Sequence, residues 1–435
     1  MKKRNKSLAV AILVLVAFAV QPAEGSLVYT PNTFGMSARG IALANALTAD
    51  DEDISGCYYN PAGLASAGLH RVGVSYIYSQ PKLEGGLSGG DHTKMEKNNK
   101  IVVLNFRSNI RKLFSERLRL PPIGLGFSVA VDNNFMTMMY FDDMRSNEGA
   151  FDRYGHANMV MQGAFGVGVT DWLSLGFGFH GGFRGKGEVT TRAEVSGESS
   201  NEGARMEGSF KPMPLGGVFA HGQSWGVGLT YRSETYGAFD SIEVTAYPSL
   251  SGFELPAMHM PMNFLDTFIP REVALGLSID ISDALTVLSD ITWREWSRYE
   301  VLAGQSEFVG SHSEFHTIDI WTPKAAAEWK INERWTARGG YRYEQTPFRT
   351  IGTRFPDGGE TVKGKATLDN DVHVSSTGFG YQFKAGDFFS TDIRIDAAYQ
   401  LHYFVPRESL TSDGYTYESE GVLHLLSASF ELEFD

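Results

Sequence analysis

Three arginines have the surroundings that a site for an anionic ligand needs. Arg294, Arg338 and Arg342 lie in strand-like segments, on rows that we assign to the inner face of a closed sheet. In an otherwise apolar pocket, a guanidinium binds a carboxylate through charge-assisted hydrogen bonds. The alternative is that the same cations form structural ion pairs. The acidic residues on inward rows that would serve as partners are Asp290, Glu344, Asp392 and Asp396.

A second candidate site is apolar and rich in methionine. The segment Tyr247–Pro270 has the position of a long loop between strands. An exposed apolar stretch marks a binding surface, and methionine adapts to varied apolar shapes. We expect a groove for hydrophobic ligands here, or else a loop that folds over its own small core or over the mouth of the fold. The residues assigned to this groove are Phe253, Leu255, Met258, Met260, Met262, Phe264, Leu265 and Phe268.

Patterns typical of catalysis or metal binding are missing from the sequence. It contains no Gly-x-Ser-x-Gly, no His-Glu-x-x-His and no phosphate-binding loop. His312 and His316 have the spacing of helical metal ligands, but they stand in a polar loop without a matching motif. We therefore expect neither an enzyme nor a bound metal or other cofactor.

The first residues have the pattern of a secretory signal. Met1–Lys6 is basic, Leu8–Val20 is apolar, and small residues allow cleavage after Ala19 or near Gly25. We assign residues 1–25 to a signal peptide. The formal net charge of −13 argues against nucleic acid as a partner. With Cys57 as its single cysteine, the chain is not a disulfide-stapled extracellular scaffold.

The gaps between the strand-like segments indicate a transmembrane barrel. From Leu69 to Phe434 there are about fourteen segments with period-two patterning, an even number within the range of outer-membrane barrels. Such barrels have short turns on the periplasmic side and tolerate long loops on the extracellular side. The short gaps are 169–172, 220–223, 281–284, 330–333 and 384–387, and the long ones are 186–208, 237–270, 300–320, 348–370 and 406–421. We predict an all-β, antiparallel, membrane-spanning β-barrel.

The two faces of the expected strands differ in polarity. On residues 392–403 the row that contains Asp392, Arg394 and Asp396 would face inward, where water and cross-strand partners satisfy charges. The opposite row is apolar and would face lipid. Tryptophans beside the short gaps are typical of an aromatic belt at one membrane interface, and they are Trp172, Trp225 and Trp335.

The segment before the first strand predicts a plug. Residues 26–68 are too apolar for disorder and too long for a tail, so we place them inside the barrel formed by residues 69–435. Asn60, Pro61 and Ala62 would act there as a gate or hinge, or as a turn that anchors the plug. The basic stretch 107–120 falls where the rhythm predicts a short turn and fits it least well.

Several motifs, in order along the chain, resemble those of one family. Tyr59-Asn60-Pro61-Ala62-Gly63-Leu64, after Ala49-Asp50-Asp51, resembles the plug signature of the FadL/TodX-type outer-membrane transporters of long-chain fatty acids and aromatic hydrocarbons. The segments that are similar to later motifs of this family are Pro270–Gly276, Asp290–Tyr299 with its Trp-x-x-Trp-Ser-x-aromatic pattern, Trp335–Pro347 and Arg354–Asp357. Outer-membrane barrels usually end on an alternating strand whose aromatic last residue is read by the insertion machinery. The final strand from Val422 matches this imperfectly, because Asp435 follows the aromatic Phe434.

The resemblance implies a monomeric, plugged barrel in the outer membrane of a Gram-negative cell. Hydrophobic small molecules, such as long-chain fatty acids or aromatic hydrocarbons, would be caught by extracellular loops. They would pass to a pocket near the plug and leave sideways into the membrane without energy coupling. Partners would be this ligand, outer-membrane lipid and the barrel-insertion machinery. The alternatives are a barrel of the same family with a structural or assembly role in secretion or surface display, and a general polar porin.

Overall fold

The structure is a computed structural model of the 435-residue chain. It describes residues 27–28, 30–66, 68, 70–90, 92–95, 98–110, 121–132, 156–157, 159–194, 199–250, 253–254, 258–299, 317–348, 369–386, 391–410 and 416–434. The expected signal peptide 1–25 and the stretch 111–120 lie outside these ranges. Among the helices of the described residues, none has the length and apolar character that crossing a membrane as a helix requires.

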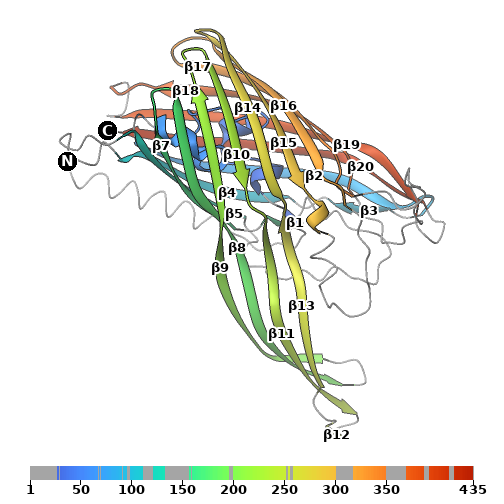
Figure 1. The fold of residues 1–435 in the computed structure, drawn as a ribbon. Helices are drawn as coiled ribbons and strands as arrows, with labels where there is room; N and C mark the ends of the chain where they lie inside the picture. Colours follow the sequence, from blue (N-terminus) through green and yellow to red (C-terminus); the bar gives the residue numbers. More distant parts are fainter. Residues whose placement is uncertain are drawn as a thin grey trace, which may run out of the picture.

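Within the described residues, fourteen strands close into a barrel (Figure 1). Each is antiparallel to the next, in the order β2, β4, β5, β7, β8, β9, β10, β14, β15, β16, β17, β18, β19 and β20. The ring closes where β20 pairs with β2, from His70↔Phe434 to Leu87↔Tyr417. Closure leaves no sheet edge in lipid, where an unpaired backbone group has no water to bond. The predicted antiparallel barrel is confirmed.

The barrel strands are long and of uneven length. They are β2 (His70–Leu87), β4 (Asn99–Asn109), β5 (Ile123–Asp132), β7 (Val160–Gly168), β8 (Leu173–Glu194), β9 (Ser199–His221), β10 (Trp225–Arg232), β14 (Arg271–Ser282), β15 (Leu285–Glu295), β16 (Ile320–Lys330), β17 (Trp335–Glu344), β18 (Val372–Phe383), β19 (Asp392–Leu410) and β20 (Thr416–Phe434). The remaining elements are β1 (Leu27–Val28), α2 (Thr30–Thr33), α3 (Ala38–Ala42), α4 (Gly56–Tyr59), the 3-10 helix η1 (Pro61–Ser66), β3 (His92–Met95), β6 (His156–Ala157), β11 (Thr235–Leu250), β12 (Phe253–Glu254) and β13 (Met258–Ile269).

The two ends of the barrel carry connections of different length, as the gap rhythm predicts. At one end, which we call the short-turn end, β7 joins β8, β9 joins β10, β14 joins β15 and β16 joins β17 through residues 169–172, 222–224, 283–284 and 331–334. The first barrel strand begins and the last one finishes at this end. The opposite, long-loop end carries the connections after β5, β8, β10, β15 and β17.

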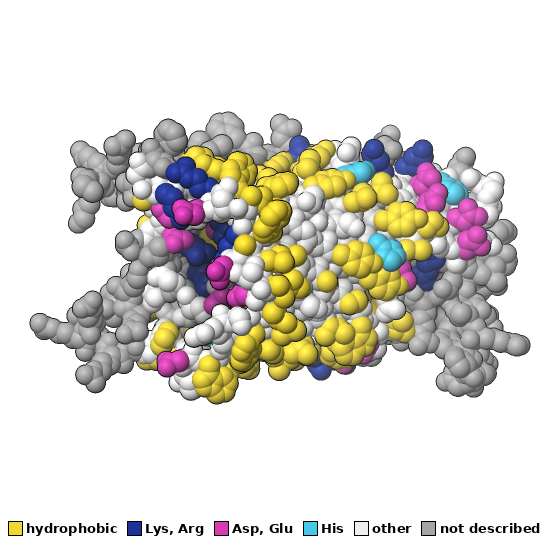
Figure 2. Space-filling view, turned by 90° about the horizontal axis from the view of Figure 1, so that it is seen from above, with side chains coloured by type: hydrophobic (Ala, Val, Ile, Leu, Met, Phe, Trp, Pro, Cys, Tyr) yellow, Lys and Arg dark blue, Asp and Glu magenta, His cyan; other side chains and the backbone are white. Residues whose placement is uncertain are grey.

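Alternation along the strands gives the barrel an apolar outer surface. On β10, Trp225, Leu229 and Tyr231 are 46%, 47% and 44% exposed, whereas Thr230 and Arg232 between and beside them are buried. The outer surface in Figure 2 accordingly shows many hydrophobic side chains. The tryptophans expected in a belt, Trp172, Trp225 and Trp335, are all exposed at the short-turn end.

Two of the expected long loops continue as strands. β8 and β9 extend past the barrel, β11 pairs in parallel with β8, and β13 pairs antiparallel with β11. These four strands form a sheet that projects from the long-loop end (Figure 1), which we call the projecting sheet. The expectation of a loop over Tyr247–Pro270 is therefore wrong for β13. The reason is that its apolar residues recur with a period of two, which suits a strand paired on one side.

The segment from α2 to η1 lies inside the barrel as the plug (Figure 1). α3 contacts β17, β18, β19 and β20, and η1 contacts β4, β5, β7, β8 and β9. Ser37 begins α3 by accepting a hydrogen bond from the Gly40 amide. Nearly every described side chain of the plug is buried. A core of plug residues and inward wall residues therefore replaces an open lumen.

Glycines on the inner wall let the plug backbone lie directly against the strands. A Cβ added at Gly176 would overlap the backbone of Pro61 and Ala62, and one at Gly228 would overlap Thr48. Other wall glycines that closely approach the plug are Gly124, Gly166, Gly217, Gly276 and Gly340. The plug is thus seated backbone-to-backbone on many strands, which only residues without a side chain allow.

We expect Gly176→Ala to disturb this seat. Its new methyl group would push the η1 backbone off β8 and lower the free energy of unfolding by about 1–3 kcal/mol, the usual cost of overpacking. Gly216→Ala is the matched control, because the nearest atom to its Cβ would be the Gly176 carbonyl oxygen at 3.6 Å. Denaturant unfolding and protease cleavage of the plug in detergent measure the effect. Equal stability of the two variants would contradict a tight backbone seat at Gly176.

Candidate functional site

An arginine of the plug ties it to the barrel wall. The Nη1 and Nη2 atoms of Arg39 donate to Asp50 Oδ1 and Oδ2 at 2.8 and 2.7 Å, and Arg39 Nε donates to Glu328 Oε2 on β16 at 3.0 Å. Arg39 is 3% exposed. Burial favours the neutral carboxyl of Asp50, but the Arg39 charge outweighs it and lowers the pKa of Asp50. Asp50 of the plug signature therefore belongs to a buried ion pair.

The network continues into the wall toward the short-turn end. Arg338 pairs with Glu328, and its Nη1 lies 2.6 Å from Asp396 Oδ1. Arg394 Nε lies 3.1 Å from the other Asp396 oxygen. Arg338 is thus held between two carboxylates, as the ion-pair alternative anticipates. The inward charges of β19, expected to face water or cross-strand partners, are at this level satisfied by such partners.

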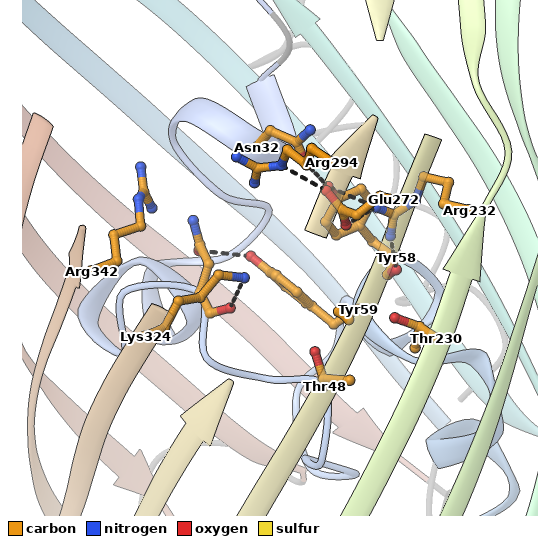
Figure 3. A pocket seen from close by; sticks show the side chains of 12 residues that line it. Asn32, Thr48, Tyr58, Tyr59, Thr230, Arg232, Glu272, Arg294, Lys324 and Arg342 are labelled. Carbon is orange, nitrogen blue, oxygen red and sulfur yellow. Dashed lines mark hydrogen bonds and ion pairs between the residues drawn. The ribbon is translucent and has the colours of Figure 1, made fainter. Parts of the chain in front are cut away.

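Arg294 and Arg342, by contrast, line a small cavity on the other side of the plug, of about 20 Å³, room for roughly one water molecule. Four basic side chains from four strands meet around it, and Figure 3 shows Lys324 and Arg342 across Tyr59 from Arg232 and Arg294. Its remaining lining comprises Asn32, Asn45, Thr48, Tyr58, Thr230, Glu272 and Ala274.

Each of these cations already has contacts with the protein. Arg294 Nε lies 3.0 Å from Glu272 Oε2, and its Nη1 lies 3.3 Å from Glu344 Oε1. Arg232 shares Glu272 at 2.6 Å. Arg342 Nη2 donates to the Thr33 carbonyl at 2.6 Å, and Lys324 Nζ donates to the Asn45 carbonyl at 3.2 Å. Arg342 and Lys324 thus each bind a carbonyl of the plug, and Arg342 Nε also lies 3.9 Å from Glu344 Oε2. Arg294 has two closer carboxylate contacts.

Asn60, Pro61 and Ala62 form a turn whose contacts are numerous. Asn60 Nδ2 donates to the carbonyls of Thr48 at 2.8 Å and of Val218 on β9 at 3.1 Å, and its Oδ1 accepts from the Ala62 amide at 3.0 Å. Asn60 is fully buried. One side chain thus joins two parts of the plug to the wall, the geometry of an anchor.

An apolar strip on the inner wall is the feature that sequence reasoning missed. Ile77 of β2 pairs with Ile101 of β4, and Val103, Ala130 and Val160 share the next register row across β4, β5 and β7. All five are buried and belong to one hydrophobic cluster with Phe34 and Met36 of the plug, Phe404 of β19, and Leu423 and Leu425 of β20. These strands carry apolar residues on both faces, so alternation alone does not reveal the inner strip; partner strands and plug identify it.

The predicted capture residues separate into groups. Met258, Met260 and Met262 pair with Ala246, Val244 and Ile242 of β11, and the register gives these six positions one face of the projecting sheet. Phe264 pairs with Phe239 on that face, whereas Leu265 pairs with Ala238 on the other. Phe253 lies in β12, and Leu255 lies outside the described residues.

Phe268, at the end of β13, belongs to a different environment. Its ring centroid lies 5.8 Å from Trp296 and 5.5 Å from Tyr299, and Phe348 completes the group at 6.2 Å from both. These rings come from three connections at the long-loop end and pack on one another. Phe268 is therefore part of an aromatic cluster at the mouth, at the base of the projecting sheet.

The residues weighed for metal or thiol chemistry add no reactive centre. His312 and His316 lie outside the described residues, and in the described part no three His, Cys, Asp or Glu side chains are grouped to hold a metal. Cys57 Sγ lies 3.0 Å from Ser128 Oγ, and burial raises the pKa of its thiol to about 11. Cys57 is thus a packed thiol that stays protonated at neutral pH.

Fold and site together define a class: an outer-membrane barrel stoppered by its own N-terminal segment. The sequence model of the outer membrane protein transport proteins (OMPP1/FadL/TodX) matches residues 14–434. The chain belongs to this family.

Relatives in sequence and structure cover almost the whole chain. Alkane uptake protein A of Marinobacter nauticus is 23% identical over 99% of this chain and 96% of its own. A FadL homologue from Pseudomonas aeruginosa superposes with a TM-score of 0.59 at 16% identity, over 96% of this chain and 100% of its own. The toluene transporter TbuX of Ralstonia pickettii gives a TM-score of 0.54 at 14% identity, over 93% and 100%.

We expect Arg39→Met to loosen the plug. The substitution leaves Asp50 and Glu328 buried without their cation, which should cost about 3–5 kcal/mol of unfolding free energy. Arg298→Met is the control, because Arg298 is 46% exposed and lies 3.6 Å from Glu234, and an exposed pair contributes about 1 kcal/mol or less. Unfolding midpoints and protease sensitivity of the plug are the measurements. An Arg39→Met protein as stable as the control would refute the anchoring role.

Proposed function

We propose that this protein admits hydrophobic small molecules by passive diffusion. Ligand is captured at the long-loop end, passes to an apolar pocket beside the plug and leaves sideways into the membrane. The observation that carries the proposal is the apolar strip around Ile77, Ile101 and Val103 on the inner wall. A general porin has a polar, water-filled lumen, in which exposing such apolar side chains to water would be unfavourable.

The projecting sheet supports the capture step. Its register gives Met258, Met260, Met262 and Phe264 one face together with Ile242 and Val244. The opposite face receives Lys186, Glu188 and Glu243 by the same register. A two-faced sheet beyond the membrane offers hydrophobic molecules an apolar surface while it stays hydrated on the other side.

The chemistry of the short-turn end favours lateral release over passage straight through. A cavity of about 340 Å³ below the plug is lined by charged residues, among them Glu328, Lys330, Arg394 and Glu431. A hydrocarbon in that space would have to displace water from ion pairs, while Tyr381 and Ile393 are the only large apolar side chains among the described residues of the lining. The membrane is the better acceptor for such a ligand.

Relatives point to the class of ligand. The alkane uptake protein and the toluene transporter are named for the hydrocarbons that they take up or transport. The family model is named for outer-membrane transport proteins. We propose the same class here, with a saturated or aromatic hydrocarbon chain as the part recognised. Whether a carboxylate is also recognised depends on the basic side chains at the plug.

Substitutions on β13 test the capture step. Changing Met260, Met262 and Phe264 to Ser removes apolar surface from one face of the projecting sheet, and we expect uptake of labelled hexadecane by proteoliposomes to fall severalfold. Met262→Ser and Leu265→Ser form the matched pair, because the register gives them opposite faces. Unchanged uptake in the triple variant, or an equal loss from Leu265→Ser, would discard this capture face.

Two other results would favour the alternative functions. Sugar uptake above that of empty liposomes would indicate a porin. Co-purification of secretion proteins would indicate an assembly role.

The arginine at the plug decides carboxylate recognition. We propose Arg342 for this role, because its Nε lies 3.9 Å from Glu344, whereas Arg294 and Arg338 each lie within 3.3 Å of two carboxylates. Arg342→Gln should lower uptake of hexadecanoate relative to hexadecane by about tenfold, the value of one charge-assisted hydrogen bond. Lys330→Gln, which removes a cation from the short-turn end, is the control. Equal losses for both substrates, or no loss, would exclude Arg342 as the carboxylate partner.

A further inference from the structure

The outer surface of β17 to β20 and β2 changes character at one level. The outward row of β20 is apolar from Phe434 to Leu426 and then continues with His424, Val422 and Glu420. On β2 the row changes between Tyr78 and Gln80, and Gln80 is the register partner of His424. Both strands therefore become polar on the same row.

That level coincides with the far edge of the bilayer. His424 is ten residues from Phe434, at the short-turn end, along a single strand. With a rise of about 3.3 Å per residue and a tilt of about 40°, this spans about 25 Å, the height of the apolar band of an outer-membrane barrel. His424 and Gln80 thus stand where lipid headgroups begin.

Hydrogen-bond donors gather at this level on adjoining strands. Tyr341, His424 and Gln80 lie on one register row, and His373, Tyr403 and Lys82 lie on the next. Lys82, Gln80, Tyr341 and Tyr403 are exposed. Figure 2 shows histidines among hydrophobic side chains on the outer surface, with basic and acidic groups farther along.

Two tyrosine–histidine pairs repeat the same geometry within this patch. The Tyr341 hydroxyl lies 2.6 Å from His373 Nδ1, and the Tyr399 hydroxyl lies 2.8 Å from His424 Nδ1. The rings stack at 6.1 and 6.2 Å with interplanar angles of 29° and 28°. A neutral imidazole that accepts a hydrogen bond from the tyrosine hydroxyl on Nδ1 carries its own proton on Nε2, and that N–H can act as a donor.

We propose that this patch binds the phosphate headgroup of an outer-membrane lipid. The patch is defined by His373, His424, Lys82, Gln80 and Tyr403. Lipid is the occupant because the patch directly continues the lipid-facing apolar rows, and phosphate is the group because a lysine beside several N–H and O–H donors suits an anion. The acids Glu84 and Glu420 lie one row farther out, beyond the headgroup level.

On the opposite side of the barrel, the basic side chain at the long-loop end of β14 is paired with a carboxylate. There Arg271 of β14 is 40% exposed and its Nε lies 3.3 Å from Glu295 Oε2, so its charge is neutralised. Tyr231 and Trp321 nearby are exposed aromatic residues of the kind found at any membrane interface. Bound lipid should therefore lie on the β18–β20–β2 side.

The test is native mass spectrometry of the purified full chain with two lipids that share acyl chains. We expect wild-type protein to retain phosphatidic acid in preference to phosphatidylcholine. The triple variant Lys82→Met, His373→Phe, His424→Phe should lose about tenfold in affinity for phosphatidic acid and little for phosphatidylcholine. Arg271→Met is the matched control, and Lys82→Arg in place of Lys82→Met should restore part of the affinity.

Several results would overturn the proposal. They are equal retention of both lipids by wild type, a triple variant that binds as wild type does, and a loss in Arg271→Met as large as in the triple variant. Heat-modifiable migration on gels establishes that each variant is folded before lipid is added. Inorganic phosphate that fails to compete at low millimolar concentration supports a lipid-specific site, whereas full competition indicates a site for free phosphate. Hydrocarbon uptake should be unchanged in the triple variant, which separates this proposal from the transport function.

Discussion

A barrel of fourteen strands encloses more space than its inward side chains can fill, and this surplus volume is the constraint on which the architecture depends. Left open, the lumen would be a water-filled pore. In this protein the N-terminal segment fills it, and inward glycines bring the plug backbone against the strands. The plug converts a hole in the membrane into a packed interior, within which small pockets of chosen polarity can exist.

The interior of the barrel differs in polarity between its short-turn end and its long-loop end. Toward the short-turn end Glu328 is shared by Arg39 and Arg338, so charged groups are paired with one another inside the barrel. Toward the long-loop end the wall from β2 to β7 carries the apolar strip, beside buried polar residues such as Ser79 and Gln162. The strands from β10 to β17 present basic groups around a cavity. A hydrophobic molecule gains about 25 cal/mol for each Å² that it buries on the apolar side. Contact with the ion pairs gives it no comparable stabilisation. A hydrophobic ligand is therefore expected to stay on the apolar side of the interior.

The sequence predicts the envelope of this fold better than its interior. The alternation on β10 and the short turn at 169–172 are set by residues close together in the sequence. Both can therefore be predicted from the sequence. The apolar strip depends on which strands are adjacent and on what the plug covers, so Ile101 and Val103 look like any other strand residues. The projecting sheet was missed for a related reason: β11 pairs in parallel with β8, a contact that no local pattern encodes. Arg338 shows the same limit, because its two acidic partners come from β16 and β19.

The plug is not held with equal strength along its length. At residues 43–44, 48–49 and 61–65 its backbone rests on wall glycines, and motion there would require several strands to give way together. Residues 33–36 are held differently: the carbonyls of Thr33 and Met36 accept hydrogen bonds from Arg342 and Asn105, and the side chains of Phe34 and Met36 pack in the apolar cluster. Side chains change rotamer far more easily than a barrel changes register. Space for a ligand beside the plug is therefore least costly to create at residues 33–36, where the apolar strip and the basic cavity are both within reach of the same segment.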